Sequence, residues 1–218
     1  MDKIKCIIFD MDNTLIDRQK SAWLAIEELV ELDFSNMTIE EKNKIIKQLY
    51  IDDAEGHVSK EGVFNKYIEE NKITGKTWED YNEMWLKILP THTMLYPETI
   101  SVLDYLRQNY RLGMITNGAS ESQHKKMEGL GFEAYFDEIL VSGDFGIDKP
   151  NPEIFLELCK RMGVTPEECV FVGDGLENDI KGSLGVGMKA IWIYPFVDCR
   201  TDLPCQRIYR IQDLRDFL

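Results

Sequence analysis

The chain contains 218 residues, of which 44% are hydrophobic and 29% charged, a composition typical of a folded globular protein rather than a disordered one. Its formal net charge is −14, which excludes the basic surface that nucleic-acid binding requires and disfavours attraction to an anionic membrane. No apolar run reaches the length of a signal peptide or of a membrane span. We therefore expect a cytoplasmic protein that binds neither nucleic acid nor membrane.

Five short apolar runs, each ending in polar or glycine-rich residues, are predicted to be strands. In chain order they span residues 4–9, 112–116, 139–142, 170–173 and 190–194. Helical patterns separate the later runs, and Asn151-Pro152 and Thr165-Pro166 mark helix starts as an N-cap residue followed by proline. Continuously apolar strands that alternate with helices indicate a doubly wound parallel sheet, which is an α/β Rossmann-like core.

The alternation of strands and helices stops after the first strand. Amphipathic helical patterns follow, and one example is the spacing of Tyr81 and Trp85 on one face. We predict a small all-helical cap subdomain over residues 17–90. It would be inserted into an α/β catalytic core formed by residues 1–16 and 91–218.

Polar clusters follow the predicted strands at their carboxyl ends, where open α/β sheets bind ligands. The first cluster contains Asp10 and Asp12, whose carboxylates repel each other unless a proton or a metal ion compensates them. The second is Thr116-Asn117-Gly118, in which a hydroxyl and turn-exposed N–H groups suit phosphate oxygens. Taken alone, each of these clusters also fits an ordinary solvated turn.

A lysine and a second acidic pair complete the pattern. Lys149 follows the third predicted strand, although a single lysine before a proline is usually a surface residue. Asp174 and Asp179 follow the fourth strand and extend into the next helix, where acidic residues also suit the helix dipole. In this order, the four clusters predict one site for a divalent cation and a phosphate group.

The four clusters resemble the motifs of the haloacid dehalogenase-like (HAD) hydrolase superfamily, and the helical insert resembles the cap of that family. The resemblance implies a phosphatase, a Mg²⁺-dependent phosphomonoester hydrolase that works through an aspartyl-phosphate intermediate. Its substrate would be a small phosphorylated metabolite, such as a nucleoside monophosphate or a sugar phosphate. Neither the exact substrate nor the oligomeric state follows from these motifs.

The catalytic roles are implied by the same resemblance. Asp10 would be the nucleophile, and Asp12 would be the general acid for the leaving alkoxide and then the base for the hydrolytic water. Thr116 and the backbone amides near Asn117 would bind the transferring phosphoryl group. Lys149 would neutralise the nucleophile and the phosphoryl oxygens.

The resemblance also implies a metal site. Mg²⁺ would bind Asp10, Asp174 and the backbone carbonyl of Asp12, with Asp179 acting directly or through another ligand. Four carboxylates beside the single ammonium of Lys149 would repel a phosphate dianion. The acidity of the site therefore predicts a strict requirement for the metal ion.

The same residues favour or disfavour several other functions. Asp12 disfavours a dehalogenase, because the dehalogenases of the superfamily lack this second aspartate. A phosphonatase would need a cap lysine that forms a Schiff base, and the cap lysines are more simply explained as solvated side chains. A β-phosphoglucomutase-like sugar-phosphate mutase shares all four motifs and is the main alternative. A non-enzymatic phospho-accepting receiver module is a distant alternative. The lysine of a receiver comes last in the chain, whereas Lys149 precedes the second acidic pair here.

Two basic segments lie outside the motifs. Arg18, at the start of the insert, is either a substrate contact or part of a hinge surface. The basic residues of the segment Gln123-His124-Lys125-Lys126 are predicted to form a solvated helix face.

Overall fold

The computed structural model describes residues 4–56, 58–193 and 202–218, and the chain divides into two compact units. One unit consists of Met1–Asp17 and Leu95–Leu218, and the other consists of Arg18–Met94. Within the described ranges, no helix has the length and apolar character needed to cross a membrane. The assignment of the two units as catalytic core and cap stays a prediction.

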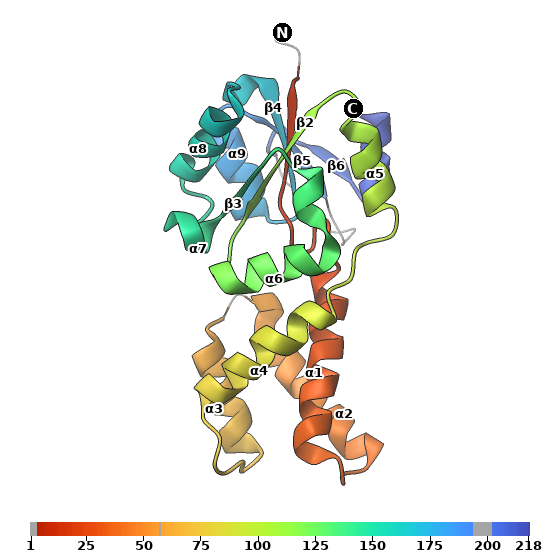
Figure 1. Cartoon of the computed structure of the whole chain (residues 1–218), viewed down its shortest axis with the longest axis vertical. Helices are drawn as coiled ribbons and strands as arrows, with labels where there is room; N and C mark the ends of the chain where they lie inside the picture. The colour runs from red at the N-terminus through yellow and green to blue at the C-terminus, as the bar shows by residue number, and fades with distance from the viewer. Residues whose placement is uncertain (1–3, 57, 194–201) are drawn as a thin grey trace. The chain divides into compact units, whose positions relative to one another are not determined.

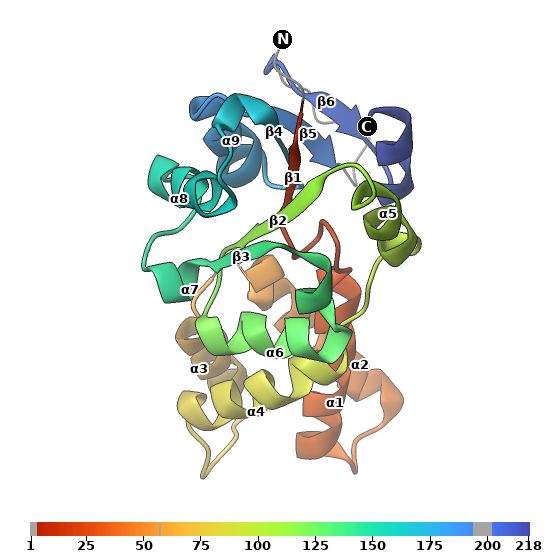
Figure 2. The ribbon, with the colours of Figure 1, turned by 45° about the horizontal axis from the view of Figure 1, so that its top comes forward.

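A six-stranded parallel sheet forms the centre of the first unit (Figure 1, Figure 2). Across the sheet the strands run β3 (Glu138–Val141), β2 (Arg111–Thr116), β1 (Cys6–Phe9), β4 (Cys169–Gly173), β5 (Lys189–Ile193) and β6 (Gln206–Ile208). The α/β prediction is confirmed, and the first five strands begin and end within two residues of the predicted runs. Residue 194 lies outside the described residues. β6 was not predicted, because three residues with one apolar side chain give no strand signal.

Helices cover both faces of the sheet. On one face, Ile7 and Phe9 belong to the core that includes α5 (Thr99–Leu106), α6 (Ser120–Leu130) and the 3-10 helix Ile211–Asp216. On the other face, Cys6 and Ile8 pack against α8 (Pro152–Met162). α9 (Gly182–Gly185) packs beside α8, on the side chains of β5 that share that face. Side chains of β1 are thus buried on both faces, as the continuous apolar run predicted.

Short helical segments connect these elements. They are α7 (Ser142–Phe145), the π-helix Leu176–Lys181, and the 3-10 helices Phe132–Tyr135 and Pro166–Glu168. The predicted helix starts are confirmed: the Asn151 side chain accepts a hydrogen bond from the Glu153 N–H, and Thr165 forms a capping box.

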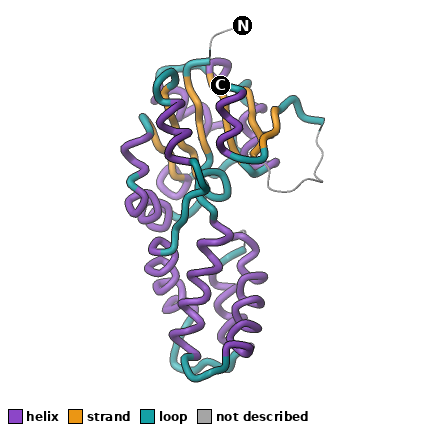
Figure 3. The backbone as a smooth tube through the Cα atoms, turned by 90° about the vertical axis from the view of Figure 1, so that its right-hand side faces the viewer, coloured by secondary structure: helices purple, strands orange, loops and turns teal. Residues whose placement is uncertain are grey.

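The second unit consists of helices joined by short loops, and no strand lies among its described residues (Figure 3). Its elements are α1 (Arg18–Phe34), α2 (Ile39–Asp53), the 3-10 helix Ala54–Gly56, α3 (Lys60–Glu70) and α4 (Trp78–Thr91). A core that contains Phe64, Tyr81 and Trp85 holds the four α-helices together. Asp33 of α1 accepts hydrogen bonds from the hydroxyl groups of Tyr67 and Tyr81, at 2.9 and 2.6 Å.

Arg18 is neither exposed nor part of a hinge surface. Its guanidinium group donates to the Asp53 carboxylate at 2.8 Å, both side chains are buried, and Lys60 pairs with the other Asp53 oxygen. Burial alone would raise the pKa of Asp53, but the two cations outweigh burial and lower it. Arg18 therefore anchors the start of α1 to the end of α2.

Candidate active site

The carboxyl ends of the three central strands meet at one edge of the sheet. Asp10 follows β1, Thr116 is the last residue of β2, and Asp174 follows β4. Because β1 lies between β2 and β4, the sheet order alone brings these three positions together. The Asp10 N–H donates to the Val172 carbonyl of β4 at 2.9 Å, so the ladder continues up to the carboxylate itself.

Lys149 is a buried cation at this edge, with 4% of its surface exposed. The Asn117 side chain holds its backbone, because the amide donates to the Lys149 carbonyl and accepts from the Lys149 N–H, both at 2.9 Å. The Lys149 Nζ donates to the Asp10 and Asp179 carboxylates at 2.7 Å and to the Ile115 carbonyl at 2.9 Å. Three acceptors satisfy the three hydrogens of the ammonium group.

Asp10, Asp174 and Asp179 form an acidic cluster, with one oxygen of each within 4.8 Å of the others. Asp179 approaches the turn after β4 so closely that a Cβ atom on Gly173 would lie 2.5 Å from its carboxylate. The Gly175 N–H donates to the second Asp179 oxygen at 2.8 Å. The glycines of this turn are therefore required by the close approach of Asp179.

Burial and mutual repulsion make the ionised forms of the acidic cluster unfavourable. Burial, opposed by Lys149 and reinforced by Asp179, raises the pKa of Asp10 to about 7. Burial and the two neighbouring carboxylates also raise the pKa of Asp174 well above its ordinary value. For Lys149, burial disfavours the charged form, but Asp10 and Asp179 outweigh burial and raise its pKa. Three converging carboxylates that one ammonium does not fully compensate are a donor set that fits a hard divalent cation such as Mg²⁺.

In the absence of metal ions, we expect the free energy of unfolding to fall as pH rises from about 4 to about 7. The folded protein retains protons on Asp10 and Asp174 in this range, whereas the unfolded chain has released them, so the stabilisation is complete below pH 3.8 and is lost through about pH 7. Denaturant titrations at successive pH values should show a fall of a few kcal/mol.

Matched variants test this pH dependence. Asp10→Asn should flatten the slope, whereas Asp104→Asn, an exposed position on α5, should leave it unchanged. Adding Mg²⁺ should stabilise the protein more at pH 7 than at pH 5, because only ionised carboxylates bind the cation. A slope that is the same in wild type and Asp10→Asn would contradict the assignment.

The Asp12 carboxylate lies outside this acidic cluster and contacts α6 instead. The Lys126 Nζ donates to both Asp12 oxygens, at 2.9 and 2.7 Å, and the Gln123 amide donates to one of them at 3.1 Å. The expected contribution of Asp12 to a metal site through its backbone carbonyl is unaffected by this arrangement and stays a prediction.

The prediction of a solvated helix face for the basic residues of segment 123–126 is wrong for Lys126. Gln123 is 2% exposed and Lys126 is 4% exposed, whereas His124 is exposed. The spacing of Gln123 and Lys126 from the apolar residues Met127 and Leu130 is that of one helix face, and this signal predicts their burial.

Further contacts complete the surroundings of the predicted residues. Thr116 is buried, and its hydroxyl accepts a hydrogen bond from Gln123 at 2.5 Å. The Thr14 hydroxyl donates to the Asp174 carboxylate at 3.4 Å, and the Trp192 indole donates to the Asp174 carbonyl at 2.8 Å. Thr14 belongs to the first polar cluster of the sequence, but its contact with Asp174 was not predicted, and no motif points to Trp192.

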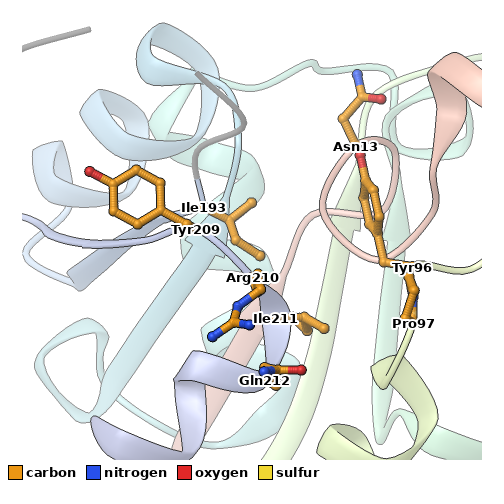
Figure 4. A pocket seen from close by; sticks show the side chains of 8 residues that line it. All are labelled: Asn13, Tyr96, Pro97, Ile193, Tyr209, Arg210, Ile211 and Gln212. Atoms are coloured by element: carbon orange, nitrogen blue, oxygen red, sulfur yellow. The ribbon is translucent and has the colours of Figure 1, made fainter. Parts of the chain in front are cut away.

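A pocket of about 170 Å³ lies elsewhere in the first unit (Figure 4). Its lining residues come from the turn after β1, from the segment before α5, from the end of β5 and from the segment that follows β6 into the 3-10 helix; they are Asn13, Tyr96, Pro97, Ile193, Tyr209, Arg210, Ile211 and Gln212. The lining contains no carboxylate and none of the predicted site residues. The pocket therefore shares no lining residue with the acidic cluster.

The sheet and the residues at its carboxyl edge agree with the family that the four motifs indicate. Sequence comparison tests this family directly. A sequence profile of haloacid dehalogenase-like hydrolases matches residues 4–187, and the chain belongs to this family. The resemblance inferred from the four motifs is thereby confirmed.

Individual relatives indicate which branch of the hydrolase family the chain resembles. N-acylneuraminate-9-phosphatase of Homo sapiens is 32% identical over 212 residues, which cover 88% of this chain and 84% of that protein. Glyceraldehyde 3-phosphate phosphatase of Methanopyrus kandleri is 32% identical over 231 residues, covering 98% of this chain and 96% of that protein. The structure of a HAD phosphatase from Thermococcus onnurineus is 28% identical with a TM-score of 0.69, covering 98% of this chain and 97% of that one. The chain is thus a HAD-like hydrolase of the phosphatase branch.

Proposed function

We propose that the protein is a Mg²⁺-dependent phosphomonoester hydrolase that acts on a small phosphorylated metabolite through an aspartyl-phosphate on Asp10. The observation that carries the proposal is the Lys149 ammonium group, which bridges Asp10 and Asp179 beside Asp174 at the carboxyl edge of the sheet. A carboxylate that attacks a phosphate dianion needs positive charge close by, and this arrangement provides it.

In the first displacement, an Asp10 oxygen attacks phosphorus and the bond from phosphorus to the ester oxygen breaks. Lys149 holds the Asp10 carboxylate in place through its 2.7 Å hydrogen bond. The Thr116 hydroxyl accepts from Gln123, so its own hydrogen is available to a phosphoryl oxygen. Asp12 donates a proton to the departing alkoxide, which leaves as an alcohol.

In the second displacement, water attacks the phosphorus atom of the aspartyl-phosphate. Asp12, now ionised, takes a proton from this water, and the bond from phosphorus to the Asp10 oxygen breaks. Inorganic phosphate is released and the Asp10 carboxylate is regenerated. Asp10, Asp174 and Asp179 would hold Mg²⁺, which supplies charge neutralisation at the phosphoryl oxygens.

The relatives narrow the substrate class within this proposal. Their names specify N-acylneuraminate 9-phosphate and glyceraldehyde 3-phosphate, which are phosphate esters of sugar-like compounds. We propose a phosphorylated sugar or sugar derivative ahead of a nucleoside monophosphate.

The test is phosphate release from a panel of these two compounds, hexose phosphates, nucleoside monophosphates and p-nitrophenyl phosphate. We expect turnover of at least one sugar-type ester with Mg²⁺ and loss of at least about 100-fold with EDTA, because three carboxylates without the cation repel the dianion. Readdition of Mg²⁺ should restore the rate.

The same panel distinguishes the alternatives. Isomer interconversion of a hexose phosphate without net phosphate release would identify a mutase instead. Undiminished release after complete metal removal would contradict the proposed metal site, and no release from any ester by the folded protein would contradict the proposed activity.

A further inference from the structure

Helix α6 carries two buried polar side chains that converge on one carboxylate. Gln123 and Lys126 are 2% and 4% exposed, and both donate to Asp12, which lies more than 100 positions earlier in the chain. Lysine and glutamine are rarely buried unless their polar groups are paired. The two side chains are therefore placed by Asp12 rather than by the helix alone.

The Lys126 ammonium group binds both carboxylate oxygens of Asp12. Its Nζ lies 2.9 Å from one Asp12 oxygen and 2.7 Å from the other, so both ends of the carboxylate are fixed relative to α6. The adjacent Lys125 has 38% of its side chain exposed and pairs with Glu121 on the same helix. These neighbouring lysines thus differ in the one contact that matters for Asp12.

Gln123 ties Asp12 to the end of β2. Its Nε2 lies 3.1 Å from an Asp12 oxygen, 2.5 Å from the Thr116 hydroxyl oxygen and 3.2 Å from the Asn117 carbonyl. A carboxylate and a carbonyl accept only, so the amide must turn its NH₂ group toward them, and this fixes its orientation. Gln123 therefore contacts two of the predicted phosphoryl-binding residues as well as Asp12.

We propose that Lys126 and Gln123 are positioning residues that hold the Asp12 carboxyl group in the orientation needed for proton transfer to the leaving oxygen and from the hydrolytic water. This inference rests on the proposed function, in which Asp12 is the general acid and base. A general acid must lie within about 3 Å of the oxygen that it protonates. The Asp12 side chain is 21% exposed, so removal of the Lys126 ammonium group would loosen a carboxylate that lies close to solvent.

A comparison of two leaving groups tests this role. An alkoxide needs a proton as it departs, whereas p-nitrophenolate is stable as an anion and leaves without one. We expect Lys126→Met to lower kcat/KM by about 30- to 100-fold for the best sugar phosphate of the panel and by less than about threefold for p-nitrophenyl phosphate. The ratio kcat/KM is used because it reports the first displacement, in which the leaving group departs.

Three variants serve as controls. Lys125→Met should change neither rate, because the Lys125 ammonium group pairs with Glu121 on the surface of the helix. Lys126→Arg should recover most of the lost rate, because a guanidinium group also binds both oxygens of a carboxylate. If Lys126 acts through Asp12, adding Lys126→Met to Asp12→Asn should lower the sugar-phosphate rate by no more than about twofold further.

The possible outcomes separate this inference from the proposed function. Equal losses on both esters would show that Lys126 acts on the phosphoryl group and would overturn the inference. An unchanged rate in a folded Lys126→Met variant, or a full further loss on Asp12→Asn, would overturn it as well. A wild-type protein that hydrolyses neither ester with Mg²⁺ would overturn the proposed function and the inference together.

Discussion

Asp10→Asn is expected to abolish phosphate release, with a loss in kcat of about 10³-fold or more, without loss of stability. A carboxamide oxygen carries no negative charge and is a far weaker nucleophile than a carboxylate oxygen, so it does not attack phosphorus. The fold itself tolerates the change, because burial and Asp179 already favour the neutral form of Asp10 and raise its pKa to about 7. Phosphate release and denaturant unfolding, measured on the same preparation, should separate the two effects.

The control for Asp10→Asn is the same substitution at Asp104, which is exposed on α5 and should leave turnover unchanged. Mass spectrometry must show that the new asparagine has not deamidated, since deamidation would restore the nucleophile. Borohydride reduction of quenched wild-type enzyme should convert an acyl phosphate at Asp10 into homoserine. Wild-type turnover by the asparagine variant would contradict the nucleophilic role of Asp10.

The positions of Asp10, Thr116 and Asp174 could be predicted from sequence because strand patterning fixes them. Each follows or ends a strand whose apolar run is visible in the sequence, and parallel strands present their carboxyl ends at one edge. Because β1 lies between β2 and β4 in the sheet, these three positions are neighbours whatever the side chains around them. This part of the candidate site depends on backbone topology alone.

Lys149 is placed by contacts that no local pattern encodes. It lies in a loop after α7, and its backbone is held by the Asn117 side chain from the end of another strand. The role of the backbone amides near Asn117 in phosphate binding stays a prediction. The hydrogen bonds of the Asn117 side chain to Lys149 were not predicted, because they depend on how two distant loops meet.

Lys126 shows why a prediction of solvent exposure made from residue type can fail. A short run of basic and polar residues on a helix is normally solvated, because burial of an unpaired charge is unfavourable. Here Asp12 supplies the partner, so the usual expectation fails. The helical spacing of these residues with Met127 was the better guide, because periodicity reports the buried face regardless of residue type.

Lys149→Met is expected to lower the free energy of unfolding by about 3–5 kcal/mol at neutral pH without metal. The substitution keeps the length of the side chain but leaves Asp10 and Asp179 buried without the ammonium group that now donates to both at 2.7 Å. The loss should shrink as pH falls, because protonation of the carboxylates removes their repulsion. Denaturant titrations at two pH values should measure both effects, and phosphate release should fall by about 10³-fold with Mg²⁺ present.

Lys181→Met is the matched control, because Lys181 pairs with Glu177 on the surface and its removal should change stability by less than about 1 kcal/mol. The double variant Lys149→Met with Asp179→Asn should recover much of the lost stability, since one of the two unpaired carboxylates is gone, but none of the lost activity. Recovery of both would show that Lys149 serves only to neutralise Asp179. Recovery of stability alone would separate the two roles of this cation, one in holding the acidic cluster together and the other in assisting attack by Asp10.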